Sequence, residues 1–123
     1  MAKNIIHTEA PILEDDSGNL YLSLDVVLQH IDYSPCTAGT GNSVMFMHKD
    51  AHKTGVTLTK PREIHVDIDN NRIIMKFDRS SDMTLSLRDG IVEMGDSSGK
   101  SIFKYGHHYI SKSDLTNLFQ KIY

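Results

Sequence analysis

The clearest pattern along the chain is a strict alternation of apolar and polar residues over positions 64–69. Three isoleucine or valine residues alternate there with a histidine and two aspartates, as in a strand with one buried and one solvated face. Asn70–Asn71 follows, and both residues tolerate the positive φ of a tight turn before a second apolar run at 73–77. The pattern therefore predicts a β-hairpin in the middle of the chain.

A second alternating segment covers residues 83–87 and leads through Asp89–Gly90 into an apolar run at 91–94. Because an Asp-Gly pair favours a tight turn between strands, we expect a second hairpin here. Further short extended segments are expected at 4–7, 11–13, 20–22, 44–48, 101–104 and 108–110.

Two segments show helical periodicity instead. Ser23 stands where an N-cap belongs, ahead of apolar residues spaced for one face of a short helix over about 24–32. Ser111 and Asp114 form a capping-box-like pair ahead of a second amphipathic segment over about 112–121. Together these elements predict an α+β fold, in which an antiparallel β-sheet of hairpins carries two short amphipathic helices.

Composition limits the domain count, the partner and the compartment. A chain of 123 residues, 39% hydrophobic and 24% charged, suits a single domain over residues 1–123. The formal net charge of -3 disfavours nucleic acid and makes a basic protein the more natural charged partner. The single Cys36 cannot form an internal disulfide, and no run is apolar enough for a leader or a membrane span. We therefore expect a cytoplasmic protein, or a periplasmic or cell-envelope protein if a leader was removed.

Residues 18–31 repeat in outline at 106–119. Both copies contain a glycine, a tyrosine, a serine at the expected N-cap and apolar positions in the following helix. Each copy is expected to form a turn, an edge strand anchored by the tyrosine, and a helix that lies on the sheet.

This arrangement resembles the copper amine oxidase amino-terminal-like, or stalk, domain of bacterial envelope proteins over about residues 18–119. The family's repeats contain a glycine followed by roughly Tyr-Val-Pro-Leu-Arg, and the corresponding stretches here are Tyr21–Asp25 and Tyr109–Ser113. Neither stretch has the proline or the arginine. The resemblance implies an antiparallel sheet with short helices and a non-catalytic role, and it carries no metal over to this chain. We expect no cofactor.

Seven histidines raise the question of a metal site. The best candidate ligands are His48, His52, Cys36, Met45 and Met47, because imidazole, thiolate and thioether suit zinc or copper. The expected strand at 44–48 places its two methionines on one face and Phe46 on the other, so we favour ordinary packing over a metal site. No combination of acid, base and nucleophile can be placed, so we expect no catalytic residues and no enzymatic activity.

Acidic residues gather at several predicted turns and on the polar side of the first hairpin. The candidates for partner binding are Glu14, Asp15, Asp16, Asp67 and Asp69. Because opposite charge steers encounter and sets specificity, these acids suit a basic protein. The favoured function is a non-catalytic protein-binding module, namely a small immunity or inhibitor protein that blocks a toxin or enzyme, with a basic nuclease toxin as one such partner.

Two alternatives stay open: a stalk-like module of the cell envelope, and a metal-binding protein that uses His48 and His52. The sequence leaves open the oligomeric state, the partner's identity and the role of the loop at 34–42. An unpaired edge strand could also recruit a partner strand or a second copy of the chain.

Overall fold

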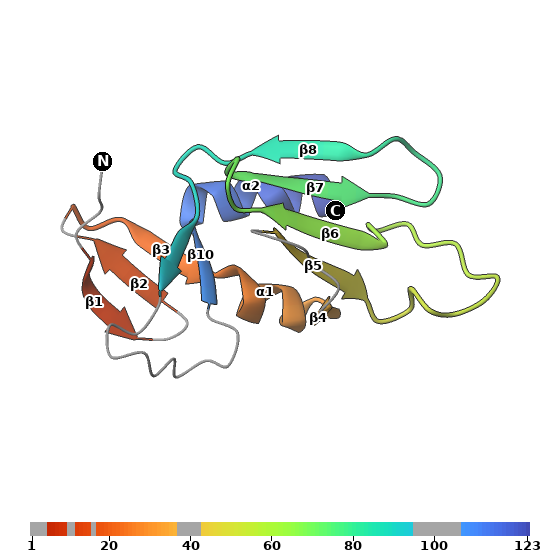
Figure 1. Cartoon of the computed structure of the whole chain (residues 1–123), viewed down its shortest axis with the longest axis horizontal. Coiled ribbons are helices and arrows are strands. Elements are labelled where there is room, and N and C mark those ends of the chain that lie inside the picture. The colour runs from red at the N-terminus through yellow and green to blue at the C-terminus, as the bar shows by residue number, and fades with distance from the viewer. Residues whose placement is uncertain (1–4, 10–11, 16, 37–42, 95–106) are drawn as a thin grey trace.

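The computed structural model describes residues 5–9, 12–15, 17–36, 43–94 and 107–123. Within these residues, antiparallel strands form two five-stranded sheets and two helices follow two of the strands, so the predicted α+β class is confirmed (Figure 1). The predicted strand at 101–104 lies outside the described residues.

The first sheet, sheet A, has the order β1-β2-β3-β10-β9. Its strands are β1 (Ile5–Glu9), β2 (Ile12–Asp15), β3 (Leu20–Ser23), β9 (Val92–Met94) and β10 (His107–Ser111). The two strands at its centre, β3 and β10, are almost ninety residues apart in the chain. This sheet therefore depends on a long-range contact between the two repeated segments.

The second sheet, sheet B, follows the chain in simple order, β4-β5-β6-β7-β8. Its strands are β4 (Tyr33–Cys36), β5 (Ser43–His48), β6 (Glu63–Asp67), β7 (Arg72–Lys76) and β8 (Met83–Ser86). The predicted central hairpin is confirmed as β6–β7, with Val66 opposite Ile73. Asn71 takes a φ of 48° in its turn, as the asparagine pair led us to expect.

The second predicted hairpin is wrong. β8 pairs with β7 in sheet B, whereas β9 pairs with β10 in sheet A, so the two segments are not partners. The connection between them is held by other parts of the chain. Asp114 accepts hydrogen bonds from the amides of Arg88 (2.8 Å) and Asp89 (2.9 Å), and the Asn71 side chain accepts one from the Ile91 amide (3.0 Å). These contacts lead the chain from one sheet to the other.

Both predicted helices are present, as α1 (Leu24–His30) and α2 (Lys112–Ile122). Ser23 accepts a hydrogen bond from the Val26 amide (3.3 Å) and Ser111 accepts one from the Asp114 amide (3.1 Å), so both N-caps are confirmed. α1 ends two residues before the predicted boundary, since the chain turns at Asp32 with a φ of 73°. Among the described residues, neither helix has the length and apolar character needed to span a bilayer.

The sequence repeat becomes a reciprocal pairing at the centre of sheet A. In the β3–β10 register Tyr21 lies opposite Ser111, and Tyr109 lies opposite Ser23. All four side chains are buried, at 0–5% exposure. Each tyrosine therefore packs beside the serine that caps the helix of the other copy.

The helices themselves match less well than the repeat suggested. Leu24 and Leu28 are fully buried on α1, but the corresponding positions on α2, Lys112 and Thr116, are exposed. The buried face of α2 instead contains Asp114, Leu115, Leu118 and Ile122. The two helices thus present different faces to the core, although they begin in the same way.

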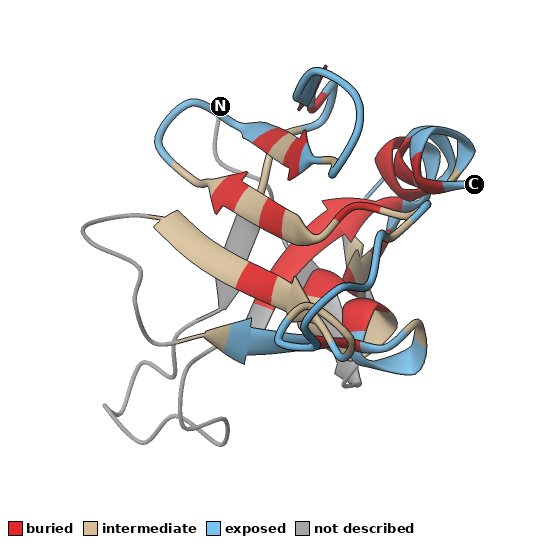
Figure 2. Cartoon of the chain, turned by 90° about the vertical axis from the view of Figure 1, so that its right-hand side faces the viewer, coloured by how far each residue is buried: buried red, intermediate tan, exposed pale blue. Residues whose placement is uncertain are grey.

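One hydrophobic cluster joins both sheets and both helices. Strand residues of sheet B that alternate inward meet the apolar faces of α1 and α2 and Ile110 of β10, and the buried surfaces of strands and helices face one another in Figure 2. Its fully buried members include Leu24, Leu28, Tyr33, Phe46, Ile64, Val66, Ile73, Met75, Ile110 and Leu118. The inward face of sheet B is therefore covered by this packing.

We predict that the buried carboxylate of Asp114 contributes strongly to stability. Asp114 is 1% exposed and accepts two backbone amides, so Asp114→Asn replaces one acceptor by a donor and leaves an amide without a partner. The expected loss is about 2 kcal/mol of unfolding free energy, measured by urea denaturation. Ser113→Ala, an exposed neighbour on the same helix turn, is the control and is expected to change stability little. Equal stability of both variants would contradict this role.

Candidate functional site

The outward face of sheet B is the surface opposite the hydrophobic cluster. Residues directly opposite one another on antiparallel strands point to the same side of a sheet, so the register of the five strands defines this face. Both helices contribute their buried residues to the cluster on the other side, and α2 passes behind β7 in Figure 1. In the part of the chain that the structure describes, no helix packs on the outward face.

A central row crosses the outward face, with one residue from each strand of sheet B. It contains Cys36, Met45, His65, Ile74 and Thr84 in the order of the strands. The first four are half-buried and Thr84 is exposed. Two flanking rows contain Ser34, Met47, Glu63 and Lys76 on one side and Ser43, Asp67, Arg72 and Ser86 on the other. The face therefore has a largely apolar middle with charged residues beside it.

The charges beside the central row are paired with one another. Asp67 accepts hydrogen bonds from the Asn70 side chain (2.9 Å) and the Arg72 guanidinium (2.8 Å), which lower its pKa from 3.8. Glu63 lies 2.9 Å from the Nε2 atom of His65. Asp67 therefore has its opposite charge, Arg72, within the face, so this acid adds less negative charge to the surface than the sequence suggested.

The five predicted partner-binding acids do not come from one element. Asp67 ends β6 and Asp69 is an exposed residue of the β6–β7 turn, so these two lie together at one end of sheet B. Glu14 is half-buried on β2 of sheet A, and Asp15 follows it in the same strand. Asp16 lies outside the described residues. A common binding surface for all five stays a prediction.

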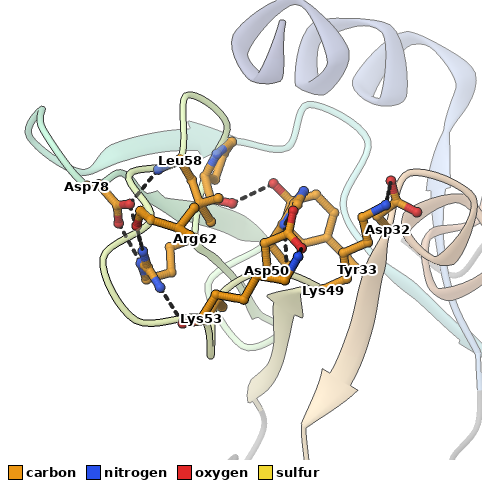
Figure 3. Close-up of polar contacts among 12 residues, drawn as sticks. Asp32, Tyr33, Lys49, Asp50, Lys53, Leu58, Arg62 and Asp78 are labelled. Atoms are coloured by element: carbon orange, nitrogen blue, oxygen red, sulfur yellow. Dashed lines mark hydrogen bonds and ion pairs between the residues drawn. The ribbon is translucent and has the colours of Figure 1, made fainter.

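The long β5–β6 loop is held in place by a single arginine, which Figure 3 shows from the side of the loop. Arg62 donates to Asp78 and to the carbonyls of Ala51 and Val56, the last at 3.0 Å. Asp78 also accepts from the Leu58 amide at 2.7 Å. Hydrogen bonds from Arg62 and Leu58 lower the pKa of Asp78 from 3.8 to about 2. This cluster ties the loop to the end of β7.

A hydrogen bond from the core also anchors the β5–β6 loop. The buried Tyr33 hydroxyl donates to the Pro61 carbonyl at 2.6 Å, and burial raises the pKa of this tyrosine. The Tyr33 ring packs edge-on against His48, with ring centroids 5.1 Å apart. Together with Arg62, this tyrosine gives the loop a fixed conformation despite its length.

The predicted metal ligands are divided between the two faces of sheet B. His48 lies opposite Tyr33 on the inward side, and its Nδ1 accepts a hydrogen bond from the Asp50 amide at 3.1 Å. Met45 and Met47 lie on the outward face, as their alternation predicted, and His52 is an exposed loop residue. No cluster of three or more histidine, cysteine or acidic ligands occurs among the described residues. The separation removes the geometric basis for a shared site of His48 with the methionines.

One cleft lies beside the Arg62–Asp78 cluster. It has a volume of about 470 Å³ and is formed by the β5–β6 and β7–β8 loops. Its lining residues are Thr57, Leu58, Thr59, Phe77, Arg79 and Ser80. These residues include no general base beside a nucleophile, so the cleft has no recognisable catalytic arrangement.

The chain matches no model of a protein family, no curated protein and no solved structure. The resemblance to the amine oxidase stalk domain stays a prediction.

Sequence reasoning missed the central row and the Arg62–Asp78 cluster. The alternation at 44–48 and at 64–69 was the available signal for the row, because each segment has one polar side. Only the strand order β4-β5-β6-β7-β8 shows that these sides join into one surface. Arg62 and Asp78 flank the β6–β7 hairpin, so the predicted hairpin was the available signal that they lie near each other. The sequence did not show that Arg62 also reaches the carbonyls of the β5–β6 loop.

We predict that the Asp78 carboxylate stabilises the fold in a pH-dependent way. Its pKa is lowered in the folded state, so its stabilising contribution is complete above the ordinary value of 3.8 and is lost as the pH falls through about 2. Asp78→Asn should therefore unfold at lower urea concentration than the unsubstituted protein at neutral pH, and the difference should shrink towards pH 2.

Asp82→Asn is the matched control for this comparison. Asp82 is 54% exposed and as far as 4.0 Å from Lys76, so its ion pair within the chain is weak. At protein concentrations low enough to keep the chain monomeric, its substitution should have little effect on stability at any pH. A difference for Asp78→Asn that stays constant between neutral and acidic pH would rule out the pH-dependent contribution.

Proposed function

We propose that this protein is a non-catalytic protein-binding module whose partner docks on the outward face of sheet B. The observation that carries the proposal is the central row, in which half-buried Met45, His65 and Ile74 lie side by side on three adjacent strands. Protein interfaces combine such an apolar centre with a polar rim, and methionine adapts its shape to a partner at low cost.

The rigidity of the scaffold supports this function. The opposite side of sheet B is fixed by the hydrophobic cluster, and the loop at one end is tied down by Arg62 and Tyr33. A surface that is already ordered loses little conformational entropy when a partner binds. The outward face is therefore organised before binding.

The form of this function that the sequence favours is a small inhibitor of the immunity type, which covers a toxin or enzyme without doing chemistry. Asp67 and Asp69 lie together at the turn end of the partner-facing hairpin, and the whole chain has a net charge of -3. A basic partner, such as a nuclease toxin, matches that charge. The pairing of Asp67 with Arg72 leaves specificity chiefly to the apolar row.

The paired repeats favour a second candidate function, a structural module of the stalk type. The reciprocal contact of Tyr21 with Ser111 and of Tyr109 with Ser23 is what two copies of a strand-helix unit need in order to form one sheet. In this candidate the chain positions a neighbour rather than blocking an active site. A native gene with an export signal favours the stalk, whereas an adjacent gene for a basic toxin favours the inhibitor.

We predict that charges placed in the central row abolish partner binding. Met45→Lys combined with Ile74→Lys buries two unpaired charges under any partner on this face, so the affinity should fall at least about tenfold. The measurement is capture of partner by the tagged protein at moderate salt, followed by titration of the identified partner. Asn117→Lys combined with Gln120→Lys, two exposed positions on α2, adds the same charge elsewhere and should bind normally.

Retention of full affinity by the Met45 and Ile74 double variant would exclude the outward face as the binding surface. Loss of affinity in the α2 variant instead would move the interface to that helix. Far-ultraviolet circular dichroism of each variant checks that the substitutions leave the fold intact.

We also predict that the candidate acids of the two sheets differ in their effect on the rate of partner association. Asp69→Ala should slow association with a basic partner at low salt, since Asp69 lies at the end of the hairpin that carries the central row. Glu14→Ala should slow it less, because Glu14 belongs to sheet A. Stopped-flow or surface-based association rates at two salt concentrations give the comparison. A larger effect for Glu14 than for Asp69 would shift the interface towards sheet A.

A further inference from the structure

Within the described residues, β8 is a short edge strand of sheet B that contains no proline and no charged side chain. It is the last strand of sheet B and is uncharged over Met83–Ser86, with the sequence Met-Thr-Leu-Ser. Natural edge strands usually avoid pairing with other chains by means of proline, charge or a bulge. The opposite edge of the same sheet has such a feature, since Pro35 in β4 has no amide to donate. Figure 1 shows β8 along one border of the molecule.

The register of β8 shows which of its backbone groups point away from the sheet. The Leu87 amide donates to the Asn71 carbonyl at 2.8 Å, so this pair is a hydrogen-bonded one. Hydrogen-bonded and non-hydrogen-bonded pairs alternate along antiparallel strands, so Leu85 bonds to β7 whereas Thr84 and Ser86 direct their amides and carbonyls outwards. Both residues are exposed. No described strand pairs with this edge, which therefore presents two donors and two acceptors in the spacing of a strand.

We propose that β8 pairs antiparallel with β8 of a second copy of this chain, centred on Leu85, to form one continuous ten-stranded sheet. In this register Thr84 of each copy lies opposite Ser86 of the other. The outward amide and carbonyl groups of these residues then form one hydrogen-bonded pair on each side of Leu85. A twofold interface is self-complementary by definition, so one surface supplies both sides.

Charge complementarity selects the second copy as occupant and fixes the register. Asp82 and Arg88 are exposed residues that flank β8 at its two ends. Centring on Leu85 therefore brings Asp82 of each copy towards Arg88 of the other, which gives two pairs of opposite charge just beyond the ends of the paired strands. Centring one residue earlier, on Thr84, would place Asp82 opposite Ser86 and leave Arg88 without an acid. Asp82 can take part because it is 54% exposed and its ion pair with Lys76, at 4.0 Å, is long.

The joined sheet would place two outward faces side by side on one surface. Each would keep its own central row, so the dimer could bind two copies of a partner or one two-fold symmetric partner. Tethering two sites in this way raises avidity without any new contact to the partner. The inference about β8 does not depend on the proposed function, because the pairing uses backbone groups of Thr84 and Ser86 and the charges of Asp82 and Arg88, whereas the proposed function uses the side chains of Met45, His65 and Ile74.

Sedimentation velocity over a range of concentrations tests the proposal. The unsubstituted chain should shift from the 13.9 kDa of one copy towards twice that mass as its concentration rises. Asp82→Arg and Arg88→Asp should each weaken association at least about tenfold, because each places like charges opposite one another. The double variant with both substitutions restores opposite charges and should regain association.

Two further variants keep the test decisive. Ser34→Arg, on the other edge of sheet B, adds a charge to β4 and should leave association unchanged. The Met45 and Ile74 double variant should also dimerise normally, so a failure of partner binding and a failure of dimerisation are distinguishable. Thermal unfolding of each variant separates weak association from a damaged fold.

A chain that stays monomeric at every concentration overturns the proposal. So does a dimer that survives both single charge changes, or one that the double charge exchange fails to restore. A dimer lost through Ser34→Arg would assign the contact to β4 and would likewise contradict it.

Discussion

The architecture depends on the pairing of β3 with β10 at the centre of sheet A. In this pairing each buried tyrosine lies opposite the serine that caps the other helix, Tyr21 opposite Ser111 and Tyr109 opposite Ser23. Each serine begins a helix immediately after its strand, so the pairing sets where both helices leave sheet A. A further contact strengthens it, since Asp25 of α1 accepts the His108 amide of β10 at 2.8 Å. Helices that start from fixed points can bring their apolar faces onto only one side of sheet B.

An outward face that the described helices leave uncovered is the consequence of that arrangement. The helices and β10 cover the inward side of sheet B, where Phe46, Ile64 and Ile73 are fully buried. Alternation then places Met45, His65 and Ile74 on the opposite side, which the described helices do not reach. Arg62 and Tyr33 hold the loop at one end of the sheet, so the surface is stiff as well as accessible. These properties suit binding rather than chemistry.

The parts of the fold set by neighbouring residues could be predicted from sequence. The β6–β7 hairpin follows from local alternation and an asparagine turn, and both N-caps follow from a serine ahead of an apolar helix. The hairpin expected at residues 83–94 was wrong because Asp114, more than twenty residues away, takes the amides of Arg88 and Asp89. Turn propensity depends on neighbouring residues, so it does not predict hydrogen bonds to a buried carboxylate of a distant helix.

For the candidate site, too, the sequence predicted the local features but not the contacts between strands. The acidic character of the first hairpin was visible in the sequence, but the ion pair between Asp67 and Arg72 depends on their facing each other across β6 and β7. Likewise, the alternation at 44–48 predicted where the methionines point without showing that His65 and Ile74 would lie beside them. Strand order supplies that information, and strand order is a long-range property.

Hydroxyl-radical footprinting of the protein, alone and with its captured partner, tests the central claim most directly. Methionine reacts readily with such oxidants, and Met45 and Met47 both lie on the outward face. The account predicts that the partner protects these two residues while Tyr123, which is 67% exposed at the C-terminal end of α2, reacts as before. Protection of Tyr123 with unchanged reactivity of Met45 and Met47 would contradict it.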